Sequence, residues 1–199
     1  MALQTKILGE LHPDHLKLPP SEIGNLPEKV LQFGTGALLR GLPDYFIDAA
    51  NRKGIFNGRA VVVKSTSSGG TDEFSEQDGL YTICIRGIDK GLEVSENIIC
   101  SAISRVLNAR SQWADILKVA CDPQVTTIIS NTTEVGITYV EESIFQEPPQ
   151  SFPAKLLACL HARYNSFGDK SAAGMVILPT ELLSDNGKKL QGILQQLAV

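Results

Sequence analysis

Short apolar runs separated by segments of helical periodicity make up most of this chain. Residues 29–33 and 59–64 have the apolar character of buried strands. Between them, residues 37–52 carry apolar side chains at a spacing that places them near one face of a helix. A strand, a helix and a second strand within roughly 35 residues predict a βαβ unit with a right-handed connection.

The rest of the chain continues this alternation. After the turn dipeptide Asp78-Gly79, residues 80–86 are strongly β-forming, and residues 91–107 predict a strand or an extended crossing segment. Two further strands are predicted over residues 124–130 and 173–178. Helices are predicted over residues 111–121, with Ser111 as the N-cap, over residues 154–164 and over residues 188–197.

A glycine turn joins the first strand to the first helix, in the segment Phe33-Gly34-Thr35-Gly36-Ala37-Leu38-Leu39-Arg40. Such a turn lets backbone N–H groups approach a pyrophosphate. Gly34 and Gly36 supply the first two glycines of the G-x-G-x-x-G pattern, and Leu39 stands at the third position. Within a βαβ unit the turn predicts a dinucleotide-binding α/β fold of the Rossmann type. We expect an open, twisted, mostly parallel sheet with helices on both faces.

The end of the second strand normally selects between the two nicotinamide dinucleotides. An Asp or Glu there binds the ribose hydroxyls of NAD, and a basic residue suits the extra phosphate of NADP. This strand ends at Lys64, which favours NADP slightly; a lysine that only ends the strand in solvent is an equal alternative. The polar run Asn131-Thr132-Thr133-Glu134 follows a later strand, where it could bind a nicotinamide ribose or carboxamide. A turn that satisfies its own backbone is the other interpretation of that run.

Composition narrows the class of protein. The formal net charge of −4 does not indicate the basic surface that is typical of a nucleic-acid-binding protein. No apolar run approaches the roughly 20 residues that a membrane span needs. The leader at residues 1–28 lacks the features of a secretory signal, so we expect a cytoplasmic protein. The spacing of Cys84, Cys100, Cys121 and Cys159 predicts reduced core residues rather than disulfides or a metal site.

Two pairs of polar residues invite a chemical interpretation. His12 and His15 flank a proline and have no neighbouring His or Cys cluster, so we expect no metal site. Asp44 and Asp48 lie four residues apart on the predicted helix, which could mimic a catalytic carboxylate pair. A solvated helix face is the more frequent origin of such a pair, and we expect both carboxylates to be exposed.

Four segments that follow turns and strands occur in an order that resembles the mannitol dehydrogenase family, closest to its tagaturonate reductase (altronate oxidoreductase) branch. The four segments are residues 33–40, 77–82, 130–136 and 179–187. The resemblance implies that Arg40 completes the cofactor turn in a G-x-G-x-x-x-R form, which accommodates Leu39. It also implies that Asp78 and residues 131–134 border the dinucleotide, and that the cofactor is NAD, with NADP as the alternative.

This resemblance implies the NAD-binding part of an oxidoreductase that transfers a hydride between NAD(H) and a sugar acid, altronate or tagaturonate. The family's catalytic Lys lies in a helical C-terminal domain, which we expect beyond Val199. Residues 29–199 would then form the dinucleotide-binding domain and be inactive without that partner. Leu182 stands where mannitol-type relatives carry a carbonyl-polarising Asn, and Asn186 is a nearby candidate for that role. A polyol or sugar-alcohol-phosphate dehydrogenase, and a nucleotide-sensing module without turnover, are the alternatives.

Overall fold

A five-stranded parallel sheet forms the centre of the computed structural model, which describes residues 3–11, 16–65, 72–133, 135–170 and 173–199. The strand order is β5-β2-β1-β6-β7, and every neighbouring pair is parallel. Counted in chain order within this sheet, the strands lie in the order 3-2-1-4-5, which matches five of the six strands of the doubly wound order 3-2-1-4-5-6. The strands are β1 (Glu28–Phe33), β2 (Arg59–Lys64), β5 (Ile103–Asn108), β6 (Thr127–Ser130) and β7 (Val176–Pro179).

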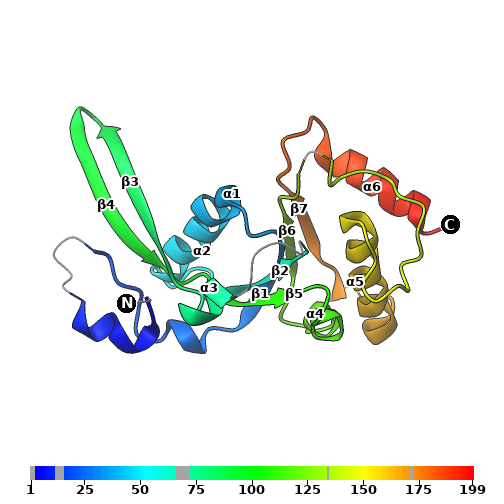
Figure 1. Cartoon of the computed structure of the whole chain (residues 1–199), viewed down its shortest axis with the longest axis horizontal. Coiled ribbons are helices and arrows are strands. Elements are labelled where there is room, and N and C mark those ends of the chain that lie inside the picture. Colours follow the sequence, from blue (N-terminus) through cyan, green and yellow to red (C-terminus); the bar gives the residue numbers. More distant parts are fainter. Residues whose placement is uncertain (1–2, 12–15, 66–71, 134, 171–172) are drawn as a thin grey trace.

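Helices cover both faces of this sheet (Figure 1). On one face lie α1 (Ala37–Gly41) and α2 (Pro43–Asn51). On the other lie α4 (Trp113–Ala120), α5 (Phe152–Phe167) and α6 (Asn186–Leu197). The predicted Rossmann-type architecture is therefore confirmed.

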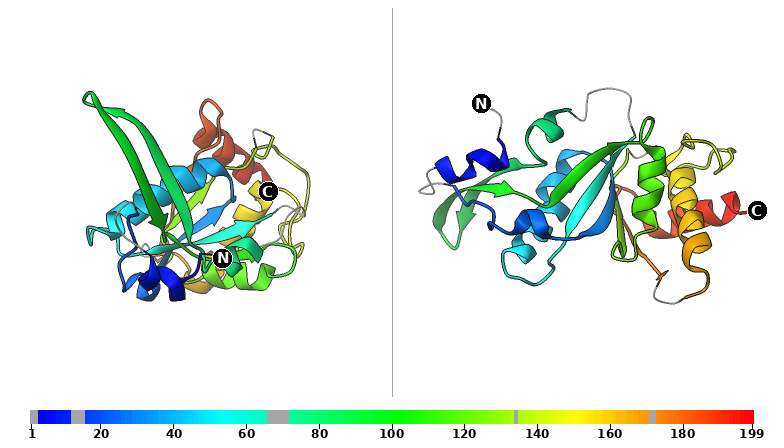
Figure 2. Two further views of the ribbon diagram at one scale, coloured as in Figure 1. Left: turned by 60° about the vertical axis from the view of Figure 1, so that its left-hand side comes forward. Right: turned by 90° about the horizontal axis from the view of Figure 1, so that it is seen from below.

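A long antiparallel hairpin projects from the body of the molecule, as all three views show (Figures 1 and 2). It consists of β3 (Tyr81–Asp89) and β4 (Leu92–Cys100), and the short helix α3 (Asp72–Glu76) precedes it. The predicted segment 91–107 is thus two strands, because β4 belongs to the hairpin and β5 to the main sheet. The leader, which contains 3-10 helices η1 (Thr5–Glu10) and η3 (Ile23–Asn25), pairs with β4 through Lys17.

The helix predicted over residues 37–52 is interrupted. Leu42 has a non-helical backbone (φ −124°, ψ −77°) between α1 and α2. Pro43 follows it, and a proline has no N–H to donate and disfavours helical geometry in the preceding residue. Pro43 therefore begins a new helix, so the prediction of one continuous helix was wrong.

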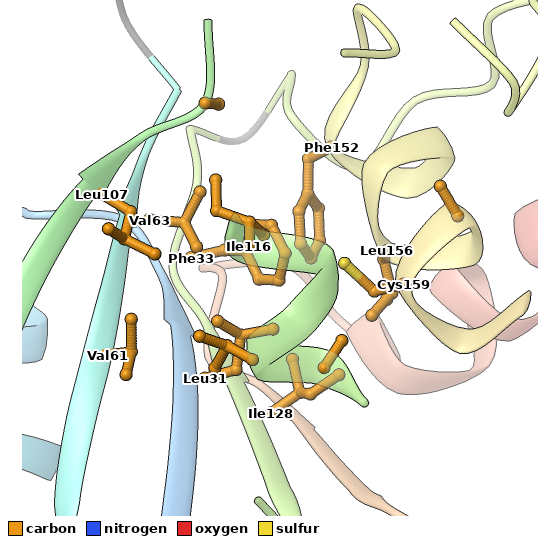
Figure 3. Close-up of a cluster of buried hydrophobic side chains, with 14 of the residues drawn as sticks. Leu31, Phe33, Val61, Val63, Leu107, Ile116, Ile128, Phe152, Leu156 and Cys159 are labelled. Carbon is orange, nitrogen blue, oxygen red and sulfur yellow. The ribbon is translucent and has the colours of Figure 1, made fainter. Parts of the chain in front are cut away.

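The main hydrophobic core lies between the sheet and the layer of α4, α5 and α6. Leu31, Phe33, Val61 and Val63 project from β1 and β2 into this layer (Figure 3). The Phe33 and Phe152 rings meet with centroids 5.3 Å apart, which anchors the start of α5 near the end of β1. This contact matters for the site, because it fixes α5 beside the glycine turn.

Some local predictions need correction. The N-cap of α4 is Gln112 rather than Ser111, and its side chain accepts a hydrogen bond from the Asn108 N–H. All four cysteines are free, and Cys100 and Cys159 are buried as predicted, but Cys84 is exposed on the hairpin. Every helix within the described ranges is too short or too polar to cross a bilayer.

Candidate functional site

A cavity of about 480 Å³ opens where β1, β2 and β6 end. In open α/β sheets, ligands bind at this carboxyl edge, beside the strand where the order reverses. The glycine turn, the end of β2, the loop after β6 and the start of α5 each contribute part of the wall. The lining residues are Gly34, Thr35, Gly36, Lys64, Ser65, Asn131, Thr132, Thr133, Gln150, Phe152 and Lys155.

Gly34 is fixed between the two neighbouring strands. Its N–H donates to the Val63 carbonyl at 3.1 Å, and its φ of +122° lies in a region that favours glycine. A Cβ at this position would lie 2.7 Å from the Asn131 carbonyl oxygen. Only a glycine therefore lets the chain turn so closely against the end of β6.

Gly36 has a different role from Gly34. It occupies the N-cap position of α1 with an ordinary φ of −67°, and a Cβ built on it would meet no atom within 4 Å. The fold does not require a glycine here. Because Gly36 lines the cavity, the space beside it is available to a ligand.

The loop that follows β6 is held by the loop that follows β7. The Asn131 amide donates to the Thr180 carbonyl at 2.7 Å, and the buried Glu181 carboxylate accepts the Thr132 N–H at 3.0 Å. The same carboxylate accepts the hydroxyls of Thr132 and Ser130. The loop also has a backbone hydrogen bond of its own, from the Gly136 N–H to the Thr133 carbonyl at 2.7 Å, so both interpretations of the sequence describe part of it.

The structure brings seven of the sequence-predicted residues together around this cavity. They are Gly34, Thr35, Gly36, Lys64, Asn131, Thr132 and Thr133. Lys64 is buried, so the alternative of a lysine that merely ends its strand in solvent was wrong. Glu134 lies outside the described residues.

The remaining residues predicted in the glycine turn do not line the cavity. Phe33 is buried in the main core, Leu39 is buried in a smaller hydrophobic cluster with Val30 and Ile47, and Ala37 and Leu38 begin α1. The Arg40 guanidinium lies 5.9 Å from the rings of Phe74 and Tyr81.

Two predicted polar residues, Asp78 and Asn186, do not line the cavity and form hydrogen bonds outside it. Asp78 accepts hydrogen bonds from the N–H and hydroxyl of Thr5, which hold the pKa of its carboxyl below the usual value. The Asn186 amide donates to the carbonyls of Pro179 and Glu181. Asp78 therefore holds the N-terminal leader against the turn before β3, and Asn186 stabilises the loop after β7.

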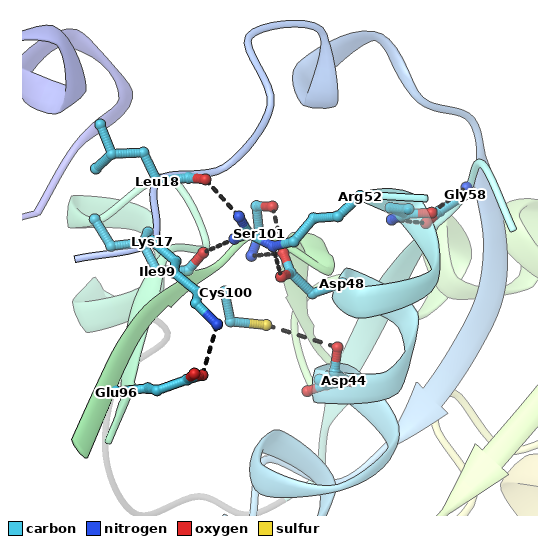
Figure 4. A network of polar contacts seen from close by, with 11 residues as sticks. Lys17, Leu18, Asp44, Asp48, Arg52, Gly58, Glu96, Ile99, Cys100 and Ser101 are labelled. Atoms are coloured by element: carbon cyan, nitrogen blue, oxygen red, sulfur yellow. Dashed lines mark hydrogen bonds and ion pairs between the residues drawn. The ribbon is translucent and has the colours of Figure 1, made fainter. Parts of the chain in front are cut away.

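Asp44 and Asp48 are both buried, so the prediction of a solvated face was wrong. Figure 4 shows how Asp48 is surrounded: it accepts the N–H and hydroxyl of Ser101, and Arg52 donates to it at 2.6 Å. Arg52 also donates to the carbonyls of Leu18 and Ile99, so the group joins α2 to the base of the hairpin.

Asp44 is linked to the glycine turn through Gln32, whose amide donates to the Asp44 carboxyl at 3.4 Å and to the Gly34 carbonyl at 3.5 Å. Burial raises the pKa of its carboxyl from 3.8 to about 7, against the opposing effects of hydrogen bonds from Gln32 and Tyr81 and the charge of Arg40. The Tyr81 hydroxyl also donates to the Arg40 carbonyl at 2.9 Å. This cluster packs α1 and α2 against the hairpin, outside the set of residues that line the cavity.

Four lining residues were not predicted from the sequence: Ser65, Gln150, Phe152 and Lys155. Phe152 and Lys155 lie in the first turn of α5, and Gln150 lies just before it, in the proline-rich segment 148–153 that leads into the helix. One signal was available, since Lys155 interrupts the apolar surface that Phe152 and Leu156 form on this helix. The described residues contain no group of three or more His, Cys, Asp or Glu side chains that could hold a metal ion, and His12 and His15 lie outside them.

Comparison with known proteins gives consistent matches. Residues 28–199 match the family model described as the mannitol dehydrogenase Rossmann domain. The chain is 46% identical over 168 residues to the altronate oxidoreductase of Halalkalibacterium halodurans, which covers 83% of this chain and 33% of that protein. It is 41% identical over 166 residues to the altronate oxidoreductase of Bacillus subtilis, covering 83% of this chain and 35% of that one. The chain thus spans about a third of the length of these curated relatives.

Two solved structures share the fold. Mannitol 2-dehydrogenase of Pseudomonas fluorescens, in a ternary complex with NAD and D-mannitol, superimposes with a TM-score of 0.85 at 20% identity. The match covers all of this chain and 42% of that one. A substrate-free D-sorbitol dehydrogenase gives a TM-score of 0.82 at 18% identity, covering all of this chain and 43% of the other.

Proposed function

The chain belongs to the mannitol dehydrogenase family, as its four sequence motifs predicted, and from this we propose that it binds NAD in the cavity at the carboxyl edge of its sheet. The observation that carries the proposal is the glycine turn, which lines that cavity together with the ends of β2 and β6. Backbone approach at Gly34 and the open space at Gly36 suit the pyrophosphate of a dinucleotide. The NAD in the related mannitol 2-dehydrogenase supports the same choice of cofactor.

The reaction we propose is hydride transfer between NAD(H) and a sugar acid, altronate or tagaturonate. The names of the relatives at 46% and 41% identity support this substrate class. The nicotinamide supplies the hydride chemistry, and the residues of this cavity bind and orient it. We further propose that the general acid/base belongs to a C-terminal domain of the same polypeptide, beyond residue 199, and that the enzyme works in the cytoplasm.

Binding of the two dinucleotides tests the first part of the proposal. We expect calorimetric titration of NAD into the 199-residue chain to give saturable binding, and NADP to bind more weakly. Equal or tighter binding of NADP would reverse the choice of cofactor. Binding of neither dinucleotide would contradict the proposed function.

Turnover tests the second part. We expect the polypeptide that contains these residues to oxidise NADH in the presence of tagaturonate, and the 199-residue chain to bind NADH without such turnover. Fructose serves as the control substrate, since a polyol dehydrogenase would reduce it instead. NADH binding without turnover of either substrate by the longer polypeptide would favour a nucleotide-sensing role.

A further inference from the structure

Lys155 is a buried cation in the wall of the candidate site. It lies in the first turn of α5, and only 4% of its surface is exposed. An ammonium group removed from water costs free energy unless other charges or polar groups compensate it. Burial accordingly lowers the pKa of Lys155, and the charge of Glu142 opposes that effect only in part. The burial of this ammonium group therefore calls for a partner that compensates its charge.

The partners of Lys155 within the described chain do not compensate its charge fully. Its ammonium donates to the Gln150 carbonyl, which uses one of its three N–H bonds. The carboxylate of Glu142 accepts the backbone N–H groups of Gln150 and Ser151 instead. Its two other ammonium donors therefore have no acceptor among the residues that the structure describes.

Lys155 also lies between two cavities. It lines the 480 Å³ cavity at the glycine turn and a second cavity of about 330 Å³. Ser65 and Gln150 are shared by both cavities in the same way, so the two adjoin at these residues. The second cavity continues to Ala109 and Arg110, which follow β5, and to the turn at Pro148 and Pro149.

This arrangement fits an extended ligand that carries negative charge near its middle. A dinucleotide has that form, with two phosphates between two nucleosides. We propose that Lys155 is a phosphate-binding residue of the dinucleotide site, with the adenosine half of the ligand extending into the second cavity. The inference rests on the proposed function and adds to it a residue outside the glycine turn. A lysine supplies a compact positive charge that suits a phosphate.

A purely structural lysine is the competing explanation, because its hydrogen bond to Gln150 holds the turn before α5. Lys155→Gln separates the two, since its amide keeps a donor for that carbonyl but carries no charge. We expect Lys155→Gln to weaken binding of NAD and ADP by about 10- to 100-fold, the usual effect of losing a hydrogen bond to a charged group. Binding of adenosine, which has no phosphate, should not change.

Lys155→Met removes both the charge and the donor, and it provides the second variant. We expect its thermal unfolding midpoint to equal or exceed that of the unaltered protein, because a buried cation is gone, while its ADP affinity falls as in Lys155→Gln. Lys118→Gln, an exposed lysine on α4, is the matched control and should bind normally.

The outcomes separate this inference from the function on which it rests. If the unaltered protein binds neither NAD nor ADP, the proposed function fails. If it binds both and Lys155→Gln binds ADP equally well, only the role of Lys155 fails. A parallel loss of adenosine and ADP affinity would also overturn that role, since it indicates a change of cavity shape rather than a lost phosphate contact.

Discussion

The carboxylate of Glu181, after β7, accepts the backbone N–H of Thr132, after β6, at 3.0 Å. The same buried side chain accepts the hydroxyls of Ser130 and Thr132. The cavity wall at Asn131–Thr133 is therefore positioned by a residue that does not itself line the cavity. Its effect on binding acts through the backbone of the β6 loop.

Replacing Glu181 should loosen this wall. We expect Glu181→Ala to lower the free energy of unfolding by about 1–3 kcal/mol, because it leaves buried donors without an acceptor. Dinucleotide affinity should fall several-fold as the β6 loop loses its fixed position. Urea unfolding followed by the fluorescence of Trp113, the single and buried tryptophan, measures the first effect. Glu141→Ala, in an exposed loop, is the control, and an equal change in both variants would contradict the prediction.

The sequence predicted the elements that depend on local pattern. β1, β2 and the glycine turn follow from short apolar runs and two glycines, which need no information about distant residues. Glu181 could not be recognised in this way, because its partner Thr132 is 49 residues away in the sequence. Lys155 was missed for a related reason, since one lysine in a helix does not reveal which side chains bury it.

The acidic pair on α2 shows where local pattern misleads. Two aspartates four residues apart are typical of an exposed helix face, and both are buried here. Their burial depends on Ser101 and Tyr81, which the hairpin brings against α2. The hairpin itself was only partly predicted, because the sequence does not show whether residues 91–107 leave the main sheet.

The two glycines of the turn should respond differently to substitution. Gly34→Ala places a Cβ 2.7 Å from the Asn131 carbonyl oxygen in a backbone region that favours glycine. We expect it to destabilise the fold by about 1–3 kcal/mol and to reduce binding as well.

Gly36→Val adds its side chain in open space, so the fold should persist while the pyrophosphate is excluded. Unfolding curves and NAD titrations measure both; unchanged NAD affinity in Gly36→Val would show that the turn is not the site.

Asp44 should make stability depend on pH. Its carboxyl ionises near pH 4 in the unfolded chain and near pH 7 in the folded one, because burial favours the neutral form. Between these values the folded state binds a proton that the unfolded state has lost, so stability falls as pH rises through this range. The pKa difference corresponds to at most about 4 kcal/mol.

Asp44→Asn, which imitates the neutral acid, isolates this contribution. We compare the unfolding free energy of Asp44→Asn with that of the unaltered protein. We expect the value for Asp44→Asn minus the value for the unaltered protein to rise steadily from pH 4 to pH 7 and to level off above pH 7. Urea unfolding at a series of pH values measures the difference. A difference that stays constant over this range would mean that Asp44 titrates normally.

Asp48 should contribute to stability through its charge and its acceptor atoms together. Asp48→Ala removes the acceptor for the N–H and hydroxyl of Ser101 and the ion-pair partner of Arg52. Because the carboxylate is buried and the Arg52 side chain is 23% exposed, we expect a loss of about 2–4 kcal/mol in unfolding free energy. Asp48→Asn should lose less, since it keeps an oxygen for Ser101. Asp115→Ala, which breaks an exposed pair with Lys118 on α4, is the control and should change stability by less than about 1 kcal/mol. Denaturant unfolding of the three variants at pH 7 tests this order, and equal losses in Asp48→Ala and Asp115→Ala would contradict it.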